Sequence, residues 1–191
     1  WVAVSELTDL VAERTWLASR TGERVQVTLR VDGDEVARGT AHLYFDYEHG
    51  PAPLKPLAGA QEPNPYQSGA LFHGPAYQRL RSLVMGSNGS SSVLSAGPET
   101  ALAGPLNPIL LDAATHGIPH DRLDRWDPTL SADQVAYPAR IERLTLHCPT
   151  PGDGEVRCEV RYHKRLAERF VAFDVQLICG QTVWASFRLI E

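Results

Sequence analysis

One short apolar helix stands against a long run of strand-forming segments, and this imbalance limits the possible folds more than any other feature of the sequence. Asn107 can cap a helix, and Pro108 suits its first position. Apolar residues dominate positions 109–117, and Gly117 followed by Pro119 is expected to end the helix. Strand patterns follow at residues 141–147, 156–163, 170–178 and 183–190. This order predicts an α+β domain in which an antiparallel sheet wraps around one helix.

The chain before this helix divides into a short unit and a proline-rich stretch. Residues 24–31 and 35–45 alternate apolar and polar side chains on either side of a turn, which predicts a hairpin. Residues 6–18 fit either a helix or an edge strand. Five prolines between residues 47 and 65 exclude regular structure there. We therefore assign residues 1–46 to a short unit, 47–65 to a Pro-rich linker and 66–191 to a fuller unit, with further strands expected at 77–85 and 91–95.

Composition excludes several functional classes. With 191 residues, 43% of them hydrophobic and 21% charged, the chain is typical of a globular protein. No run approaches the roughly 18–20 consecutive apolar residues of a membrane span, and the net charge of -5 argues against a nucleic-acid partner. Three widely spaced cysteines suit free thiols in the cytoplasm. Because the chain starts at Trp1, without a Met or a signal-peptide pattern, we expect it to be part of a longer polypeptide.

Asp112 and His116 are the residues whose spacing most suggests chemistry. They are four positions apart on the predicted helix, so their side chains share one face. A carboxyl group on an apolar helix beside an imidazole can act as a proton donor. A structural role for Asp112 near the helix N-terminus is the alternative. A metal site built from His116, His120 and Asp121 is not expected, because Pro119 breaks the helix that would align the imidazoles.

Three segments in order resemble motifs of polyketide synthase dehydratase domains. Residues 72–78 (FHGPAYQ) are similar to the family's Gly-Tyr-Gly-Pro-x-Phe-Gln motif, with His73 in place of the tyrosine. Residues 107–116 (NPILLDAATH) resemble its His-Pro-x-Leu-Leu-Asp-Ala-x-x-Gln/His helix. Residues 135–141 (VAYPARI) are a looser version of its Leu-Pro-Phe-x-Trp segment. The resemblance is close from residue 66 onward and rests on layout alone for residues 1–45.

The resemblance implies a double hotdog fold, in which two antiparallel sheets each wrap a long helix and share one active site. Residues 66–191 would then be the C-terminal hotdog, and residues 1–46 an incomplete first hotdog. The implied activity is that of a hydro-lyase, which removes water from a 3-hydroxyacyl chain on an acyl carrier protein. Asp112 would protonate or hold the departing hydroxyl and His116 would orient Asp112. The residues expected to bind substrate are Tyr77, His73, Gly74, Pro75 and Gln78.

One departure from the family limits these expectations. The family's catalytic histidine lies in a His-x-x-x-Gly-x-x-x-x-Pro motif, which this sequence does not contain, and we expect it upstream of Trp1. Two alternatives therefore stay open: a non-catalytic double-hotdog scaffold, and a product-template or thioester-hydrolase-like domain. The implied partners are an acyl carrier protein and neighbouring synthase domains, with a homodimer expected only by analogy. No organic cofactor or metal is implied, since the phosphopantetheine arm arrives with the carrier protein.

Overall fold

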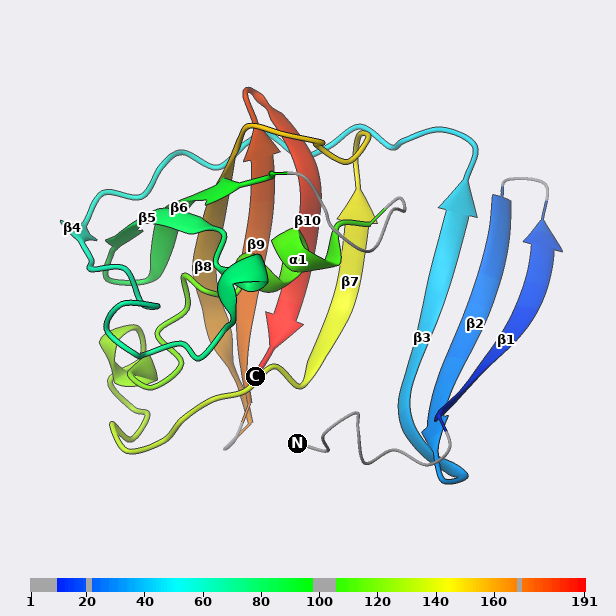
Figure 1. The fold of residues 1–191 in the computed structure, drawn as a ribbon, viewed down its shortest axis with the longest axis horizontal. Helices are drawn as coiled ribbons and strands as arrows, with labels where there is room; N and C mark the ends of the chain where they lie inside the picture. Colours follow the sequence, from blue (N-terminus) through cyan, green and yellow to red (C-terminus); the bar gives the residue numbers. More distant parts are fainter. Residues whose placement is uncertain (1–9, 20–21, 98–105, 168–169) are drawn as a thin grey trace. The chain divides into compact units, whose positions relative to one another are not determined.

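A computed structural model of the chain describes residues 10–19, 22–97, 106–167 and 170–191 (Figure 1). The chain separates into two compact units, Trp1–Tyr47 and Glu48–Glu191, which are described one at a time. Residues 48–65, assigned above to a linker, lie within the second unit.

The first unit is a three-stranded antiparallel sheet with the order β1-β2-β3. Its strands are β1 (Leu10–Ser19), β2 (Gly22–Val31) and β3 (Asp34–Tyr44). Between β2 and β3, Asp32 and Gly33 both have positive φ angles, of 51° and 87°, as a tight two-residue hairpin turn requires. The hairpin predicted for this region is therefore present. Within residues 6–18, the described part is a strand and not a helix.

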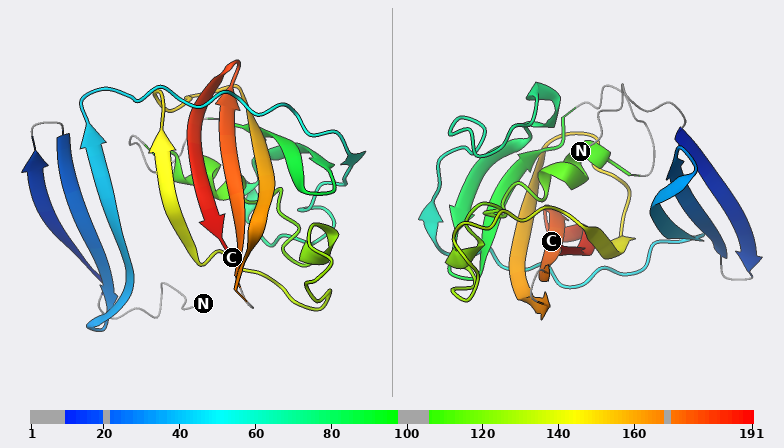
Figure 2. Two further views of the ribbon diagram at one scale, coloured as in Figure 1. Left: turned by 180° about the vertical axis from the view of Figure 1, so that it is seen from behind. Right: turned by 90° about the horizontal axis from the view of Figure 1, so that it is seen from below.

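The second unit is built on a seven-stranded antiparallel sheet with the order β4-β5-β6-β8-β9-β10-β7 (Figures 1 and 2). Its strands are β4 (Ala60–Gln61), β5 (Leu80–Met85), β6 (Gly89–Ser95), β7 (Arg140–Leu146), β8 (Glu155–Ala167), β9 (Phe170–Cys179) and β10 (Thr182–Ile190). The helix α1 (Pro108–Ala113) lies between β6 and β7 in the chain and against one face of the sheet (Figure 1). The unit has the hotdog-like antiparallel sheet that the sequence predicts, but with little helix.

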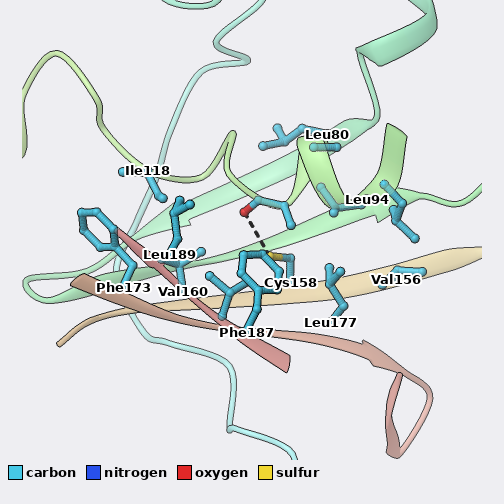
Figure 3. Packing of buried hydrophobic residues seen from close by; sticks show 14 of the residues in the cluster. Leu80, Leu94, Ile118, Val156, Cys158, Val160, Phe173, Leu177, Phe187 and Leu189 are labelled. Atoms are coloured by element: carbon cyan, nitrogen blue, oxygen red, sulfur yellow. Dashed lines mark hydrogen bonds between the residues drawn. The ribbon is translucent and has the colours of Figure 1, made fainter. Parts of the chain in front are cut away.

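The core lies between α1 and the sheet. Leu110 and Ala113 of α1 are each only 1% exposed and join a cluster of apolar side chains from β5, β6, β8, β9 and β10. Figure 3 shows Val156, Val160 and Leu177 within this cluster. The Cys158 thiol donates a hydrogen bond of 3.5 Å to a backbone carbonyl that follows α1. Burial of these side chains is the main force that holds helix and sheet together.

The helix is shorter than its sequence pattern predicts, because it ends at Ala113 and not at Gly117. Its start is as expected: the Asn107 side chain accepts a hydrogen bond of 2.7 Å from the Leu110 N–H. At the other end, the N–H groups of Thr115 and His116 bond three residues back, to Asp112 and Ala113. The chain therefore tightens into 3₁₀-type turns, so the long helix expected from the resemblance is absent from the described residues.

The strand expected at residues 77–85 begins later, at Leu80. A 3₁₀ turn, Pro75–Tyr77, occupies the preceding positions, because Pro75 fixes φ at the start of a tight turn. Within the described residues, no helix is long and apolar enough to cross a membrane.

The proline-rich segment is fixed to the sheet by side chains of β8 and β9. The Gln176 side-chain oxygen accepts a 2.8 Å hydrogen bond from the Leu54 N–H, and the Arg157 guanidinium donates one of 2.7 Å to the Leu54 carbonyl. Arg161 donates a further bond of 2.8 Å to the carbonyl of Lys55. The segment has little regular structure, as its prolines predict, but the backbone groups of Leu54 and Lys55 are paired with side chains of the sheet.

Candidate functional site

Two histidines and one aspartate of the second unit bring their polar atoms together beside α1. His116 Nε2 lies 3.2 Å from Asp112 Oδ2, and His73 Nε2 lies 3.5 Å from the same oxygen. The two Nε2 atoms are 3.2 Å apart. We refer to His73, Asp112 and His116 as the His-Asp-His cluster. The four-residue spacing of Asp112 and His116 does place them together, although His116 lies in the turn after α1.

The loop before β5 brings His73 to this cluster. The backbone carbonyl of His73 accepts a hydrogen bond of 2.7 Å from the Gln78 side chain, which ties the loop across the 3₁₀ turn. Its ring stacks on Phe72 with a centroid distance of 4.9 Å and an angle of 13° between the planes. These two contacts restrict the direction in which the imidazole can point, so its Nε2 atom is held toward Asp112.

Tyr66 holds the other imidazole. Its hydroxyl lies 2.6 Å from His116 Nδ1 and accepts a hydrogen bond of 3.2 Å from the Leu80 N–H. With the Leu80 N–H occupying one lone pair of the hydroxyl, the Tyr66 proton is free to point at Nδ1. A neutral His116 then carries its proton on Nε2, directed into the cluster.

The three members of the cluster differ in access to solvent. The His116 side chain is 0% exposed, whereas that of Asp112 is 36% and that of His73 20% exposed. Asp112 can therefore meet a bound molecule and His116 can only act through Asp112 or His73. Burial, followed by the charge of His116, lowers the pKa of His73, so that imidazole is biased toward its neutral form. Burial also raises the pKa of Tyr66 and keeps its hydroxyl protonated.

The other residues predicted to bind substrate surround His73. The Tyr77 ring is 40% exposed, and its centroid lies 6.5 Å from that of His73. Gly74 begins the 3₁₀ turn and Pro75 is its first residue. A methyl group added at Gly74 would meet no atom within 4 Å, so packing within the described residues does not require glycine there. The structure gathers the predicted residues in one place, and their roles stay predictions.

His120 does not join the cluster. Its Nδ1 lies 3.0 Å from the Glu191 carboxylate, and its Nε2 lies 3.1 Å from the Thr115 carbonyl. Burial lowers the pKa of His120, but the hydrogen bond and charge of Glu191 outweigh burial, so the net pKa is raised. The pair fastens the turn after α1 to the end of β10.

Tyr66 is the member of this neighbourhood that sequence reasoning missed. It lies 50 positions before His116 and directly after the prolines, where no local pattern marks a functional residue. Only the contact between Tyr66 and His116 marks Tyr66 as part of the site, and a single sequence does not reveal contacts between distant segments.

A separate open cavity of about 620 Å³ lies over β7, β9 and β10. Its lining includes Arg143, His147, Asp174 and Arg188, together with Glu48 at the start of the second unit. None of the cluster residues line it. It therefore does not belong to the candidate site.

Several solved structures have a similar fold. The dehydratase domain of RzxB from Pseudomonas fluorescens matches with a TM-score of 0.63 and 19% identity, over 99% of this chain and 70% of that one. The dehydratase domain of the CurJ module of curacin polyketide synthase matches with a TM-score of 0.65 and 15% identity, over 94% and 66%. The pyran synthase domain from module nine of the sorangicin pathway matches with a TM-score of 0.61 and 17% identity, over 92% and 67%. At these identities the likeness shows a common fold.

Sequence comparison shows the family. A comparison with curated protein sequences gave no match. The family model described as the polyketide synthase dehydratase N-terminal domain matches residues 48–183, which is most of the chain and includes all three members of the His-Asp-His cluster. The chain therefore belongs to the polyketide synthase dehydratase family.

Proposed function

We propose that the chain is part of a dehydratase domain that removes water from a 3-hydroxyacyl thioester carried by an acyl carrier protein. The observation that carries this proposal is the position of Asp112: its carboxylate is partly exposed and lies beside His116 Nε2 at 3.2 Å. The substrate would reach Asp112 on its exposed side, near Tyr77 and the turn at Gly74 and Pro75. The product would be the enoyl thioester.

The chemistry requires an acid and a base on different sides of the substrate. Asp112 serves as the acid: it gives a proton to the departing hydroxyl, and His116, held by Tyr66, orients the carboxylate. The base takes the proton next to the thioester carbonyl. His73 does not suit that task, because its Nε2 lies 3.5 Å from Asp112 and therefore on the same side as the acid.

The base is instead expected from the segment upstream of Trp1. In this proposal the three-stranded first unit is part of a first hotdog, and the second unit is the other hotdog of a double hotdog domain. The matched family model carries the description of an N-terminal domain, whereas the motif order assigns the same residues to the C-terminal hotdog. The expected partners are the carrier protein and neighbouring synthase domains, and the expected location is the cytoplasm.

Replacement of Asp112 by Asn tests the proposal. The variant keeps the shape of the side chain and removes its proton-donating group. In a polypeptide that includes the upstream segment, loss of water from a 3-hydroxyacyl thioester should fall by about 100- to 10,000-fold, the usual contribution of a general acid. Asp121→Asn, an exposed position outside the cluster, is the matched control and should keep its rate. Undiminished turnover by the Asp112 variant would remove Asp112 from the mechanism.

A second candidate is a domain that shapes or cyclises the chain in place of dehydrating it. The presence of His73 where the family motif has tyrosine favours it, as does the similar fold of the sorangicin pyran synthase domain. Mass spectrometry of the product separates the candidates. An enoyl thioester supports dehydration, a cyclic thioester supports ring formation, a free acid supports hydrolysis, and unchanged substrate supports a scaffold.

A further inference from the structure

We propose that the His-Asp-His cluster binds one divalent transition-metal ion, with zinc as the ion that its ligands suit best. The ligands are His73 Nε2, His116 Nε2 and Asp112 Oδ2, three atoms of different side chains that all lie within 4.8 Å of one another. The sequence did not predict this set, because His73 lies far from the other two ligands in the chain and enters through the loop before β5.

The distances between the three atoms fit a shared ion. The separations are 3.2, 3.2 and 3.5 Å. Zinc–ligand bonds of about 2.0–2.1 Å in a tetrahedral site place neighbouring ligand atoms about 3.3–3.4 Å apart. The triangle therefore matches one face of a zinc tetrahedron, and the combination of two imidazoles with one carboxylate is a set that zinc accepts.

Protein hydrogen bonds alone satisfy the cluster poorly. Asp112 Oδ2 is buried from solvent, and among the described residues it has no hydrogen-bond partner of regular geometry, although both imidazoles lie close. The two Nε2 atoms, 3.2 Å apart, form one hydrogen bond when only one of them carries a hydrogen, and that bond leaves Asp112 Oδ2 unpaired. A cation lying above the triangle, at the centre of the tetrahedron, would accept a lone pair from each of the three atoms and so give Asp112 Oδ2 a partner.

The surroundings suit a metal site with an open position. When His116 binds an ion through Nε2, its proton lies on Nδ1 and is donated to the Tyr66 hydroxyl 2.6 Å away, which is the support that metal-binding histidines usually have. Three protein ligands leave a fourth position, on the side where Asp112 is 36% exposed.

The claim that the cluster binds zinc is independent of the proposed function. One consequence of zinc binding, described next, rests on the proposed function. Asp112 cannot ligate a cation and protonate a leaving hydroxyl at the same time. If the domain is a dehydratase, zinc therefore inhibits it, and a chelator restores the rate. The site would then make dehydration sensitive to free zinc.

Titration of the metal-free chain with zinc alone, followed by calorimetry, tests the binding claim. We expect one ion per chain, and cobalt(II) in its place should give the strong visible absorption of a tetrahedral complex. His73→Phe keeps a ring that can stack on Phe72 but lacks the nitrogen, and it should weaken binding by more than about 10-fold, as should Asp112→Asn. His163→Phe is the matched control, since His163 pairs with Asp174 away from the cluster, and it should bind as the unaltered chain does.

The outcomes separate this inference from the proposed function. Absence of stoichiometric zinc binding to the unaltered chain overturns the inference, and this result does not depend on whether a variant folds. Equal binding by the unaltered chain, His73→Phe and Asp112→Asn, with circular dichroism showing that both variants are folded, also overturns it. Zinc binding by the full polypeptide, with no water loss even after a chelator has removed the zinc, contradicts the proposed function alone.

Discussion

Removal of the Tyr66 hydroxyl is the most informative test of how the position of His116 is fixed. Tyr66→Phe keeps the ring and removes one oxygen, which contacts His116 Nδ1 at 2.6 Å and accepts the Leu80 N–H at 3.2 Å. Both of these residues are only 2% exposed, so water cannot easily replace the lost partner. The variant therefore leaves two buried polar groups without a hydrogen bond.

The loss of unfolding free energy can be calculated from these two buried groups. Each buried group left unsatisfied costs about 1–3 kcal/mol, and the variant no longer has to bury a hydroxyl, so the net loss of unfolding free energy should be about 3 kcal/mol. For a domain of this size that loss corresponds to a fall in Tm of about 6–12 °C. Tyr137→Phe removes a hydroxyl from a ring that is 60% exposed, and it should change the unfolding free energy by less than about 0.5 kcal/mol.

Urea unfolding followed by circular dichroism gives the comparison. A double-mutant cycle with His116→Phe assigns the effect to the contact itself, because the second substitution should cost less once the Tyr66 hydroxyl is absent. A loss below about 0.5 kcal/mol, or strictly additive effects of the two substitutions, would refute the view that Tyr66 holds His116.

Three further outcomes follow from other parts of the second unit. Gly89→Ala should destabilise the unit by about 1–3 kcal/mol or more in urea unfolding, since the new methyl carbon would lie 2.2 Å from the Val160 carbonyl oxygen of the neighbouring strand. Cys158, whose pKa burial raises to about 12, should resist alkylation in the folded chain and react only after unfolding, as mass spectrometry would show. The raised pKa of His120 stabilises the fold while His120 is protonated, so the unfolding free energy should fall as the pH rises above 6.5, and Glu191→Gln should flatten this dependence.

The Gly89 and Cys158 outcomes each have a matched comparison. Gly152→Ala should be tolerated, because a methyl group there meets no atom of the described residues within 4 Å. Cys148 and Cys179 are partly exposed and should react before Cys158 does. Labelling of Cys158 at the same rate as these two, or a Gly89 variant as stable as the Gly152 variant, would contradict the packing described for the sheet.

The pattern of apolar and polar residues along the chain predicted many of the strands. The strand predicted at 183–190 is present as Thr182–Ile190, because its apolar side chains meet the core at regular positions. The strand predicted at 141–147 is present as Arg140–Leu146, in which Leu144 and Leu146 pack against the same core. The same reasoning failed at the end of the helix and at the start of β5. Both positions are decided by backbone hydrogen bonds in tight turns, which apolar periodicity does not report.

The candidate site was predictable only where its residues are neighbours in the chain. The four-residue spacing of Asp112 and His116 predicted their contact, and the motif resemblance predicted that His73 belongs to the site. Neither the spacing nor the resemblance predicted that His73 would lie against Asp112 and His116, or that Tyr66 would contact His116. These contacts join segments that are far apart in the sequence, and they form only in the folded second unit.

The identity of the product tests the central claim most directly. A 3-hydroxyacyl thioester on an acyl carrier protein would be incubated with a polypeptide that contains this chain and the segment upstream of Trp1, and the carrier-bound product would be identified by mass spectrometry. We predict loss of one water to give the enoyl thioester, with the rate of this loss lowered about 100- to 10,000-fold by Asp112→Asn. A free acid, a cyclic thioester or unchanged substrate from the unaltered polypeptide would contradict the assignment as a dehydratase.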